Sequence, residues 1–410
     1  MKEQSGTADW RRITGVMVGV SFIAFIGFSF VMPFLPLYFA ELGVRDPASA
    51  ALWAGVTLAT APLCAGLTAP LWGLLADRHG VKRIVLVGMI AYVVLLVVLS
   101  YVTAPWQVVV GWAAMGLFGG FTSLSLGLVA VVAPRGRVTM AVGLIQAGQI
   151  LGTAMGPALG GLAAERSGMR GSFIVAAVLT ALAATVLVLL LPEVRVLASS
   201  RNSARGPQGL RGLRETLRLP GFATILGVLL LARGIERTLD PVLPLYVGQL
   251  QSTGVAATTG LIAMSGTLAT AVASVAVSRL VERWSATRLL TIALLGGALT
   301  CVPLALVANA QQLLALRVVW GLFAGGIMTL AFASGGLLLP PERRGGAFGL
   351  LGSATYYGMA GGTFMAGLLA SFHLQSVFFV DAILYLAALV WLNRPAARQP
   401  RVQQSVESAR

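Results

Sequence analysis

The sequence predicts an all-α membrane protein with twelve transmembrane helices, arranged as two six-helix bundles. The first observation is composition: of the 410 residues, 57% are apolar and only 10% are charged, whereas a soluble domain carries about 25% charged residues. The second is a series of apolar runs that are each long enough to cross a bilayer, which takes about 20 residues. The third is a repeat between the two halves of the chain.

Twelve apolar runs meet the length requirement, and most connections between them are so short that neighbouring helices must be antiparallel. The longest polar stretch divides the runs into six and six. We therefore expect an N-terminal bundle over 1–192, a basic cytoplasmic linker over 193–220, and a C-terminal bundle with a short tail over 221–410. The runs cover approximately residues 13–40, 51–74, 84–103, 105–133, 141–164, 172–192, 221–249, 256–278, 288–307, 311–339, 345–370 and 373–393.

Basic residues set the expected orientation, because short cytoplasmic loops collect Lys and Arg. Most of the 29 Lys and Arg residues fall on one side of the predicted topology, and this side also holds both termini. The other side holds only Arg45, Arg166 and Arg170. Both termini are therefore predicted to be cytoplasmic. The net charge of +15 is spread over several short segments, which argues against nucleic acid as a partner.

Few residues are available for metal, cofactor or enzyme chemistry. Cys64 and Cys301 lie far apart in apolar runs, and the histidines are His79 and His373 alone. These residues predict neither a disulfide framework nor a metal site. The runs contain no nucleophile beside an obvious base, and the chain has no Walker sequence. We therefore expect neither an enzyme nor an ATP-driven pump, and no cofactor.

The two halves of the chain repeat each other at corresponding positions. The first run ends in MPFLPLY (32–38) and the seventh in DPVLPLY (240–246). The fourth run contains GLFGG (116–120), and the tenth contains GLFAG (321–325). Parallel six-helix repeats on either side of a cytoplasmic linker are typical of a transporter, whose substrate site lies between the halves.

A short polar hinge joins the second and third runs. Its functional candidates are two glycines, three basic residues and one carboxylate: Gly73, Asp77, Arg78, Gly80, Lys82 and Arg83. Charged groups are costly inside a bilayer, so the hinge belongs at a membrane surface. The basic residues suit an anchor that fixes the orientation of the helices in the membrane, whereas the Asp77 carboxylate contributes nothing to that orientation.

The fifth run carries glycine at every fourth residue, at Gly148, Gly152, Gly156 and Gly160. On a helix these positions form one bare face, which lets a neighbouring backbone approach closely in lipid. Pro157 interrupts the hydrogen-bond ladder and permits a bend. Tight packing alone is one explanation of this pattern, and a role in the direction of transport is the other.

These segments resemble motifs of the major facilitator superfamily, and in particular of its bacterial drug:proton antiporter branch. The hinge resembles the superfamily's loop between helices 2 and 3. The fifth run resembles the antiporter motif of drug-efflux members in Gly143, Gly152, Gly156, Pro157, Gly160 and Gly161. The resemblance implies the major facilitator fold, the bacterial cytoplasmic (inner) membrane and export by alternating access. It also implies that Asp77 latches the two halves near the start of run 345–370.

One position departs from the resembled branch. Its members usually carry an arginine in helix 4, four residues before a glycine, and this arginine is often linked to proton transfer. Here Trp112 precedes Gly116 at that spacing, whereas Arg317 precedes Gly321 in the repeat-related run. The proton-relay role therefore cannot be carried over to the fourth helix.

Four charged residues share one face of the seventh predicted helix: Arg233, Glu236, Arg237 and Asp240. Such charges must be paired or face water, and Arg233 can reach Glu236 while Arg237 can reach Asp240. This charged stripe is either a self-neutralised packing surface or a proton-coupling site, in which we place Asp240 ahead of Glu236. Asp381, in a twelfth helix that is commonly peripheral in the superfamily, ranks lower.

Aromatic and amide residues are candidates for the substrate cavity, because flat rings bind varied lipophilic molecules. Packing in the core or against lipid explains the same residues equally well. The candidates are Phe25, Phe28, Trp112, Gln146, Gln149, Tyr356 and Tyr357.

The sequence thus predicts a monomeric secondary transporter that exports small lipophilic compounds or drugs in exchange for protons. Its expected partners are the lipid bilayer, the small-molecule substrate and protons. Two alternatives remain at this stage. One is an exporter or uptake carrier for a single metabolite, such as a sugar or siderophore, and the other is a membrane scaffold that transports nothing.

Overall fold

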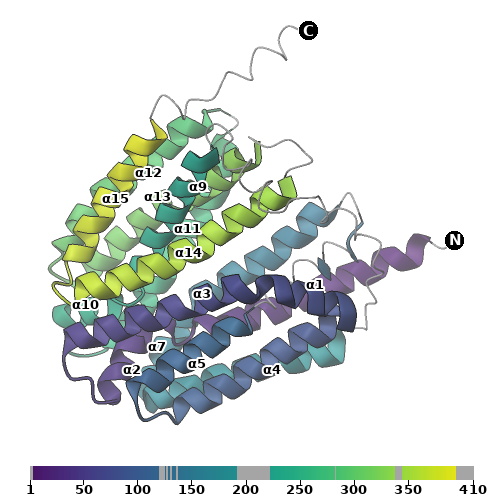
Figure 1. The fold of residues 1–410 in the computed structure, drawn as a ribbon, viewed down its shortest axis with the longest axis horizontal. Coiled ribbons are helices and arrows are strands. Elements are labelled where there is room, and N and C mark those ends of the chain that lie inside the picture. Colours follow the sequence, from purple (N-terminus) through teal and green to yellow (C-terminus); the bar gives the residue numbers. More distant parts are fainter. Residues whose placement is uncertain are drawn as a thin grey trace, which may run out of the picture.

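The computed structural model is helical over most of the residues that it describes, which are 3–119, 125, 128–129, 132–134, 137–191, 222–281, 283–337 and 344–393. Seven helices in this part of the chain are long and apolar enough to cross a bilayer. The helices form two bundles that converge at the left of Figure 1, beside α2 and α10, and diverge away from it. The predicted domain boundaries and the basic linker, 193–220, lie outside the described residues.

The first bundle holds the helices up to residue 190 and has an apolar core that includes Phe34, Phe39 and Phe173. Its longest helix, α7, covers the predicted fifth and sixth runs. Gly168 separates these two parts, because its φ of +71° lies in the left-handed region that favours glycine. The elements are α1 (Glu3–Ser29), the 3-10 turn η1 (Met32–Phe34), α2 (Leu35–Glu41), α3 (Pro47–His79), α4 (Val81–Ser100), α5 (Pro105–Leu117) and α7 (Val138–Leu190).

The second bundle holds the helices from residue 222 onward and has its own apolar core, which includes Trp320, Phe378 and Tyr385. The described helices agree with the predicted runs with three exceptions: α1 begins earlier, the first and seventh runs are interrupted, and α5 covers only the first part of the fourth run, 105–133. Most of residues 120–131 lie outside the described part of the chain. The elements are α9 (Phe222–Thr238), α10 (Leu243–Leu250), α11 (Val255–Leu280), α12 (Ala286–Ala305), α13 (Ala310–Leu337), α14 (Arg344–Ala370) and α15 (Ser376–Leu392).

Proline accompanies both interruptions, at equivalent places in the two repeats. Pro33 lies in the turn η1 between α1 and α2, and Pro241 lies in the turn between α9 and α10. Proline has no backbone N–H and cannot continue the helical ladder. The DPVLPLY and MPFLPLY segments therefore each end one helix and begin a short second one.

A tyrosine fixes the short helix after each interruption. Tyr38 Oη donates a hydrogen bond to the Leu99 carbonyl at 2.5 Å, and Tyr246 Oη donates one to the Leu304 carbonyl at 3.0 Å. Leu99 lies near the end of α4 and Leu304 near the end of α12, so the contacts correspond between the bundles. The sequence repeat is thus also a repeat of side-chain contacts.

The glycine stripe of α7 packs against α1. A Cβ added to Gly152 would overlap the Phe22 carbonyl oxygen, and one added to Gly160 would overlap the Phe30 carbonyl oxygen. The stripe glycines at 148 and 156 also face α1. Gly143 differs, because nothing lies within 4 Å of the position of its Cβ. The predicted bare face is therefore a helix-packing surface, in which Gly143 takes no part.

The repeated GLF segments serve the same kind of contact in each bundle. A Cβ added to Gly116 of α5 would overlap the Ala61 carbonyl oxygen of α3. One added to Gly321 of α13 would lie 2.6 Å from the Gly266 carbonyl oxygen of α11. Close backbone approach at small residues is how helices associate without a hydrophobic driving force in lipid.

The two bundles touch each other through small residues. A Cβ added to Gly55 of α3 would lie 2.7 Å from the Gly367 Cα of α14. One added to Gly260 of α11 would overlap the Pro157 carbonyl oxygen of α7. Gly55 lies near the start of α3, which follows α2, and Gly260 lies near the start of α11, which follows α10; α2 and α10 contact each other.

Further groups support this contact between the bundles, which we call the junction. Glu165 Oε1 accepts a hydrogen bond from the Ala257 N–H at 3.1 Å. A Cβ added to Gly161 would overlap the Ala256 carbonyl oxygen. Ala256 packs in the core of the first bundle, and Ala51 packs in the core of the second. Each bundle thus places a small residue in the core of the other.

Gly152→Val should lower the free energy of unfolding by about 1–3 kcal/mol, the usual cost of forcing extra volume into a packed site. The matched variant Gly143→Val should leave it nearly unchanged, because its side chain enters open space. Thermal unfolding of both purified variants in detergent measures the difference. Equal losses in the two variants would contradict the packing assigned to the stripe.

Candidate functional site

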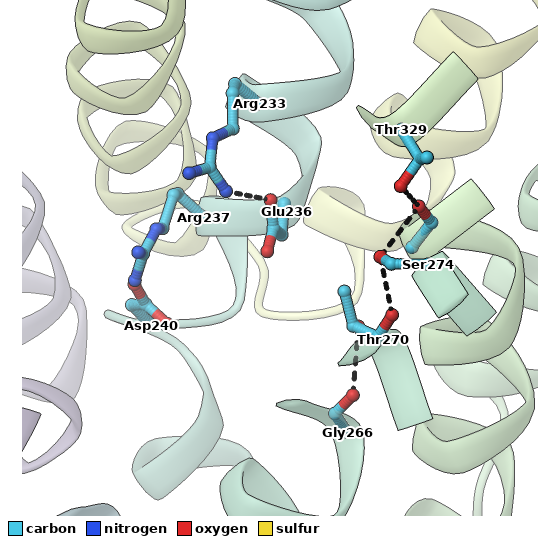
Figure 2. Close-up of polar contacts among 9 residues, drawn as sticks. Arg233, Glu236, Arg237, Asp240, Gly266, Thr270, Ser274 and Thr329 are labelled. Atoms are coloured by element: carbon cyan, nitrogen blue, oxygen red, sulfur yellow. Dashed lines mark hydrogen bonds and ion pairs between the residues drawn. The ribbon is translucent and has the colours of Figure 1, made fainter. Parts of the chain in front are cut away.

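The charged stripe lies around the end of α9 (Figure 2). Arg233 Nη1 lies 2.5 Å from Glu236 Oε2, and Arg237 Nη1 lies 3.1 Å from Asp240 Oδ2. Both predicted ion pairs are therefore confirmed. Between 20% and 23% of each of the four side chains is exposed. Each pair is thus electrically neutral, and its side chains remain partly exposed.

Asp240 is held by a turn and not by a helix. Helix α9 ends at Thr238, and the Asp240 N–H donates to the Arg237 carbonyl oxygen at 3.3 Å within the turn before Pro241. Glu236, in contrast, lies inside α9. Movement of the turn alone can therefore separate the Asp240 carboxylate from Arg237, whereas Glu236 keeps its helical position.

Two more charged side chains are buried in the same bundle. Arg317 on α13 is 7% exposed, and its guanidinium carbon lies 4.3 Å from the centre of the Trp320 ring, a cation–π contact. Asp381 on α15 is 2% exposed, and its Oδ2 lies 2.6 Å from Thr238 Oγ1. Asp381 is thus a core residue and not the peripheral one that its helix suggested. Thr238 is distant in sequence, so no local spacing pointed to the pair.

Hydroxyl side chains link α11 to α13 (Figure 2). Thr270 Oγ1 donates to the Gly266 carbonyl oxygen at 2.9 Å, and Thr329 Oγ1 donates to the Gly325 carbonyl oxygen at 3.2 Å. Ser274 Oγ lies 3.1 Å from the Gly325 carbonyl oxygen, which joins the two helices. The spacing of Thr270 and Ser274, one helical turn apart, was the available sequence signal for this group.

Three of the aromatic candidates lie where helices of different segments meet. The ring centres of Phe25 and Phe28 on α1 are 6.1 Å apart, and Phe28 lies 5.8 Å from Tyr92 on α4. Tyr356 belongs to α14 of the other bundle and packs over Gly66 of α3, with 3.7 Å between the Tyr356 Cβ and a Cβ added to Gly66. Tyr356 therefore lies at the boundary between the bundles.

The other four cavity candidates are dispersed. Trp112 is 3% exposed and packs in the core of the first bundle. Gln146 is exposed, and Tyr357 is 52% exposed. Gln149 is half-buried, and its Nε2 has no hydrogen-bond partner among the described residues. Of these four, Gln149 alone offers a buried and unpaired polar group.

A cavity of about 340 Å³ lies between the start of α1 and the start of α7. Its lining combines apolar side chains, such as Trp10 and Leu144, with the guanidinium groups of Arg11 and Arg137. None of the predicted cavity residues lines it, and it is separate from the charged stripe.

The polar hinge contains a backbone break at Gly80, whose φ of +88° separates α3 from α4. Lys82 Nζ donates to the carbonyl oxygens of Val188, at 3.1 Å, and of Leu191. It thereby binds the C-terminal end of α7, where unpaired carbonyls attract a cation. Arg78 and Arg83 are exposed.

The predicted latch falls partly outside the described residues. The surroundings of Gly73, the side chain of Asp77 and the side chains of residues 344–351, near which Asp77 was expected to bind, are not described. The latch therefore stays a prediction, whereas Lys82 has a contact that its sequence position did not suggest.

The sequence profile of the Major Facilitator Superfamily matches residues 17–310 and residues 228–409. These two matches cover both bundles. The chain belongs to the major facilitator superfamily. Members of this superfamily are transporters, so the protein is a multi-pass membrane transporter.

Curated relatives within the superfamily are multidrug resistance proteins. The chain is 28% identical over 406 residues to "Multidrug resistance protein MdtG" of Escherichia fergusonii, a match that covers 98% of each chain. It is 29% identical over 329 residues to the protein of the same name from Dickeya zeae, with 80% of each chain covered.

Solved structures share the fold at lower identity. The nucleoside transporter NupG aligns with a TM-score of 0.76 and 14% identity, over 93% of this chain and 99% of that one. The human organic anion transporter MFSD10 aligns with a TM-score of 0.64 and 19% identity, over 94% and 99% of the two chains. These likenesses establish the major facilitator fold.

Arg233→Gln should cost about 1–3 kcal/mol of unfolding free energy, because it leaves the Glu236 carboxylate without its partner. The double variant with Glu236→Gln should recover part of that loss, since neither charge is then left unpaired. Thermal unfolding of the single and double variants measures the coupling. If the double variant lost as much unfolding free energy as the two single variants together, the side chains would not be paired.

Proposed function

We propose that the protein exports small lipophilic compounds in exchange for protons across a bacterial cytoplasmic membrane. It would do so with twelve transmembrane helices and with both termini in the cytoplasm. The observation that carries this proposal is the partly exposed, self-neutralised Arg237–Asp240 pair at the interruption between α9 and α10. The MdtG relatives, which are named multidrug resistance proteins, support the choice of substrate class.

The proton step follows from the charges of the stripe. While Asp240 is ionised, it neutralises Arg237, and the turn stays closed. Protonation of Asp240 removes this attraction and frees the turn before Pro241. The proton returns to water when Arg237 and Asp240 pair again. Binding and release of one proton thereby switch the segment that leads directly into α10 between its paired and unpaired forms.

The junction supplies the mechanical element of the cycle. Its contacts are backbone against backbone at Gly55 and Gly367, and at Pro157 and Gly260. Such contacts contain few side chains that must be repacked when two rigid bundles rotate against each other. We infer that the junction opens when the opposite end of the molecule closes, which exposes the site to each side in turn.

The substrate is proposed to lie near Phe28, Tyr92 and Tyr356, where the two bundles meet. Aromatic rings supply large apolar contact area with few geometric demands. Because the stripe carries no net charge, the site favours lipophilic character over one particular charge.

Asp240→Asn should lower the rate of proton-driven dye efflux about tenfold or more, which corresponds to about 1.4 kcal/mol in the barrier. The measurement uses everted membrane vesicles that are energised with a proton gradient, with and without an uncoupler. The matched control is Asp46→Asn. Asp46 caps α3 by accepting hydrogen bonds from Ala48 and Ser49, and asparagine caps equally well.

The uncoupler and the variant test different parts of the proposal. Efflux that survives the uncoupler would contradict proton antiport altogether. Normal efflux by Asp240→Asn, with efflux by the wild type abolished by the uncoupler, would contradict only the assignment of Asp240. The Asp46→Asn control should transport normally in either case.

A further inference from the structure

The carboxyl of Asp381 lies at the contact between α15 and the last residue of α9. Only 2% of Asp381 is exposed, and Thr238 is fully buried. Asp381 Oδ1 has no hydrogen-bond partner among the described residues. A carboxylate in such a place needs a cation or several donors, because an isolated buried charge is very costly. The described part of the chain places no cation in ion-pair contact with it.

The hydrogen atoms at this contact can be counted. Thr238 Oγ1 lies 2.8 Å from the Ile235 carbonyl oxygen and 2.6 Å from Asp381 Oδ2. A threonine hydroxyl has one hydrogen and can donate to only one of these oxygens. The carbonyl oxygen of Ile235 has none to offer. If both short distances are hydrogen bonds, the second hydrogen must belong to the Asp381 carboxyl.

Other titratable groups face Asp381 from the elements around it. They are Arg317 on α13, Cys301 on α12 and Tyr385 on α15 itself. Glu236 on α9 interacts electrostatically with Tyr385 and Arg317. Helix α14, which also packs against α15, has only Tyr356 and Tyr357 as titratable residues among its described side chains.

Arg317 is the cation with capacity for a new partner. Its Nε and Nη1 atoms are buried and have no hydrogen-bond partner among the described residues. The stripe carries two positive and two negative charges, so it leaves no net charge to compensate Arg317. An ionised Asp381 would balance the positive charge of Arg317.

We propose that Asp381 is a proton-binding site, in which the carboxyl holds its proton against Thr238 in this conformation and pairs with Arg317 when the proton leaves. The O–H bond of the carboxyl breaks, and the proton passes to water. The Thr238 hydroxyl then turns from the Ile235 carbonyl to the carboxylate. The last turn of α9 loses one hydrogen bond, directly before the segment that holds Asp240. This proposal requires neither the export function nor the assignment of Asp240.

Infrared difference spectroscopy of the purified, lipid-reconstituted protein tests the proposal without any transported substrate. The C=O stretch of a protonated carboxylic acid is separate from the bands of a carboxylate. At neutral pH, the wild type should show such a band from a buried acid, and Asp381→Asn should lack it. Asp240→Asn is the matched control and should keep the band, because Asp240 is paired with Arg237. If Asp381→Asn kept every carboxylic acid band of the wild type, the proposal would be overturned.

Two further variants test the partners of the carboxyl and do not depend on the folding of Asp381→Asn. Thr238→Val removes the acceptor of the acid O–H and should shift the band to higher wavenumber, whereas Thr238→Ser should leave it in place. Arg317→Gln removes the cation that pairs with the ionised Asp381 carboxylate. The band should then persist in alkaline buffer in which the wild type loses it. An unshifted band in Thr238→Val, or an unchanged pH dependence in Arg317→Gln, would contradict the assigned partner.

Discussion

Close approach of helix backbones at glycine is the interaction on which the rest of this structure depends. The α7 stripe meets α1 at Gly152 and Gly160, and the GLF segments meet α3 and α11 at Gly116 and Gly321. The same kind of contact joins the bundles at Gly55. Lipid offers no hydrophobic force to drive helices together, so packing at small residues has to supply the association. The antiporter-like motif therefore has a structural role that precedes any role in the direction of transport.

The charged residues follow a second constraint, which is that ions in the membrane must be neutralised. They gather in the second bundle, where the stripe of α9 pairs internally and Arg317 packs on Trp320. The first bundle has Trp112 at the position equivalent to Arg317. The two bundles thus share their backbone plan and differ in charge, which is why the proposed proton sites all lie in the second one.

Much of the fold was predictable from sequence because its signals are local. Apolar runs predicted the helices, and the spacing of Arg237 and Asp240 predicted the ion pair. The interruptions of the first and seventh runs were not predicted, although Pro33 and Pro241 accompany them. Contacts between distant segments were not predictable in this way: no spacing relates Asp381 to Thr238 or Lys82 to the end of α7. The cavity candidates were mixed for the same reason, since an aromatic residue in a run has no sequence mark that separates a core ring such as Trp112 from one at the bundle boundary such as Tyr356.

The bundles are proposed to separate at the junction during transport, and a reversible cross-link at that junction tests this separation most directly. Glu165→Cys with Ala257→Cys replaces a contact between the bundles, in a background in which Cys64 and Cys301 are changed to alanine. A short, reducible dithiol reagent should abolish dye efflux from vesicles that carry both new cysteines, and reduction should restore it. Vesicles with either cysteine alone should be unaffected. Full efflux with the cross-link in place would contradict opening of the junction during transport.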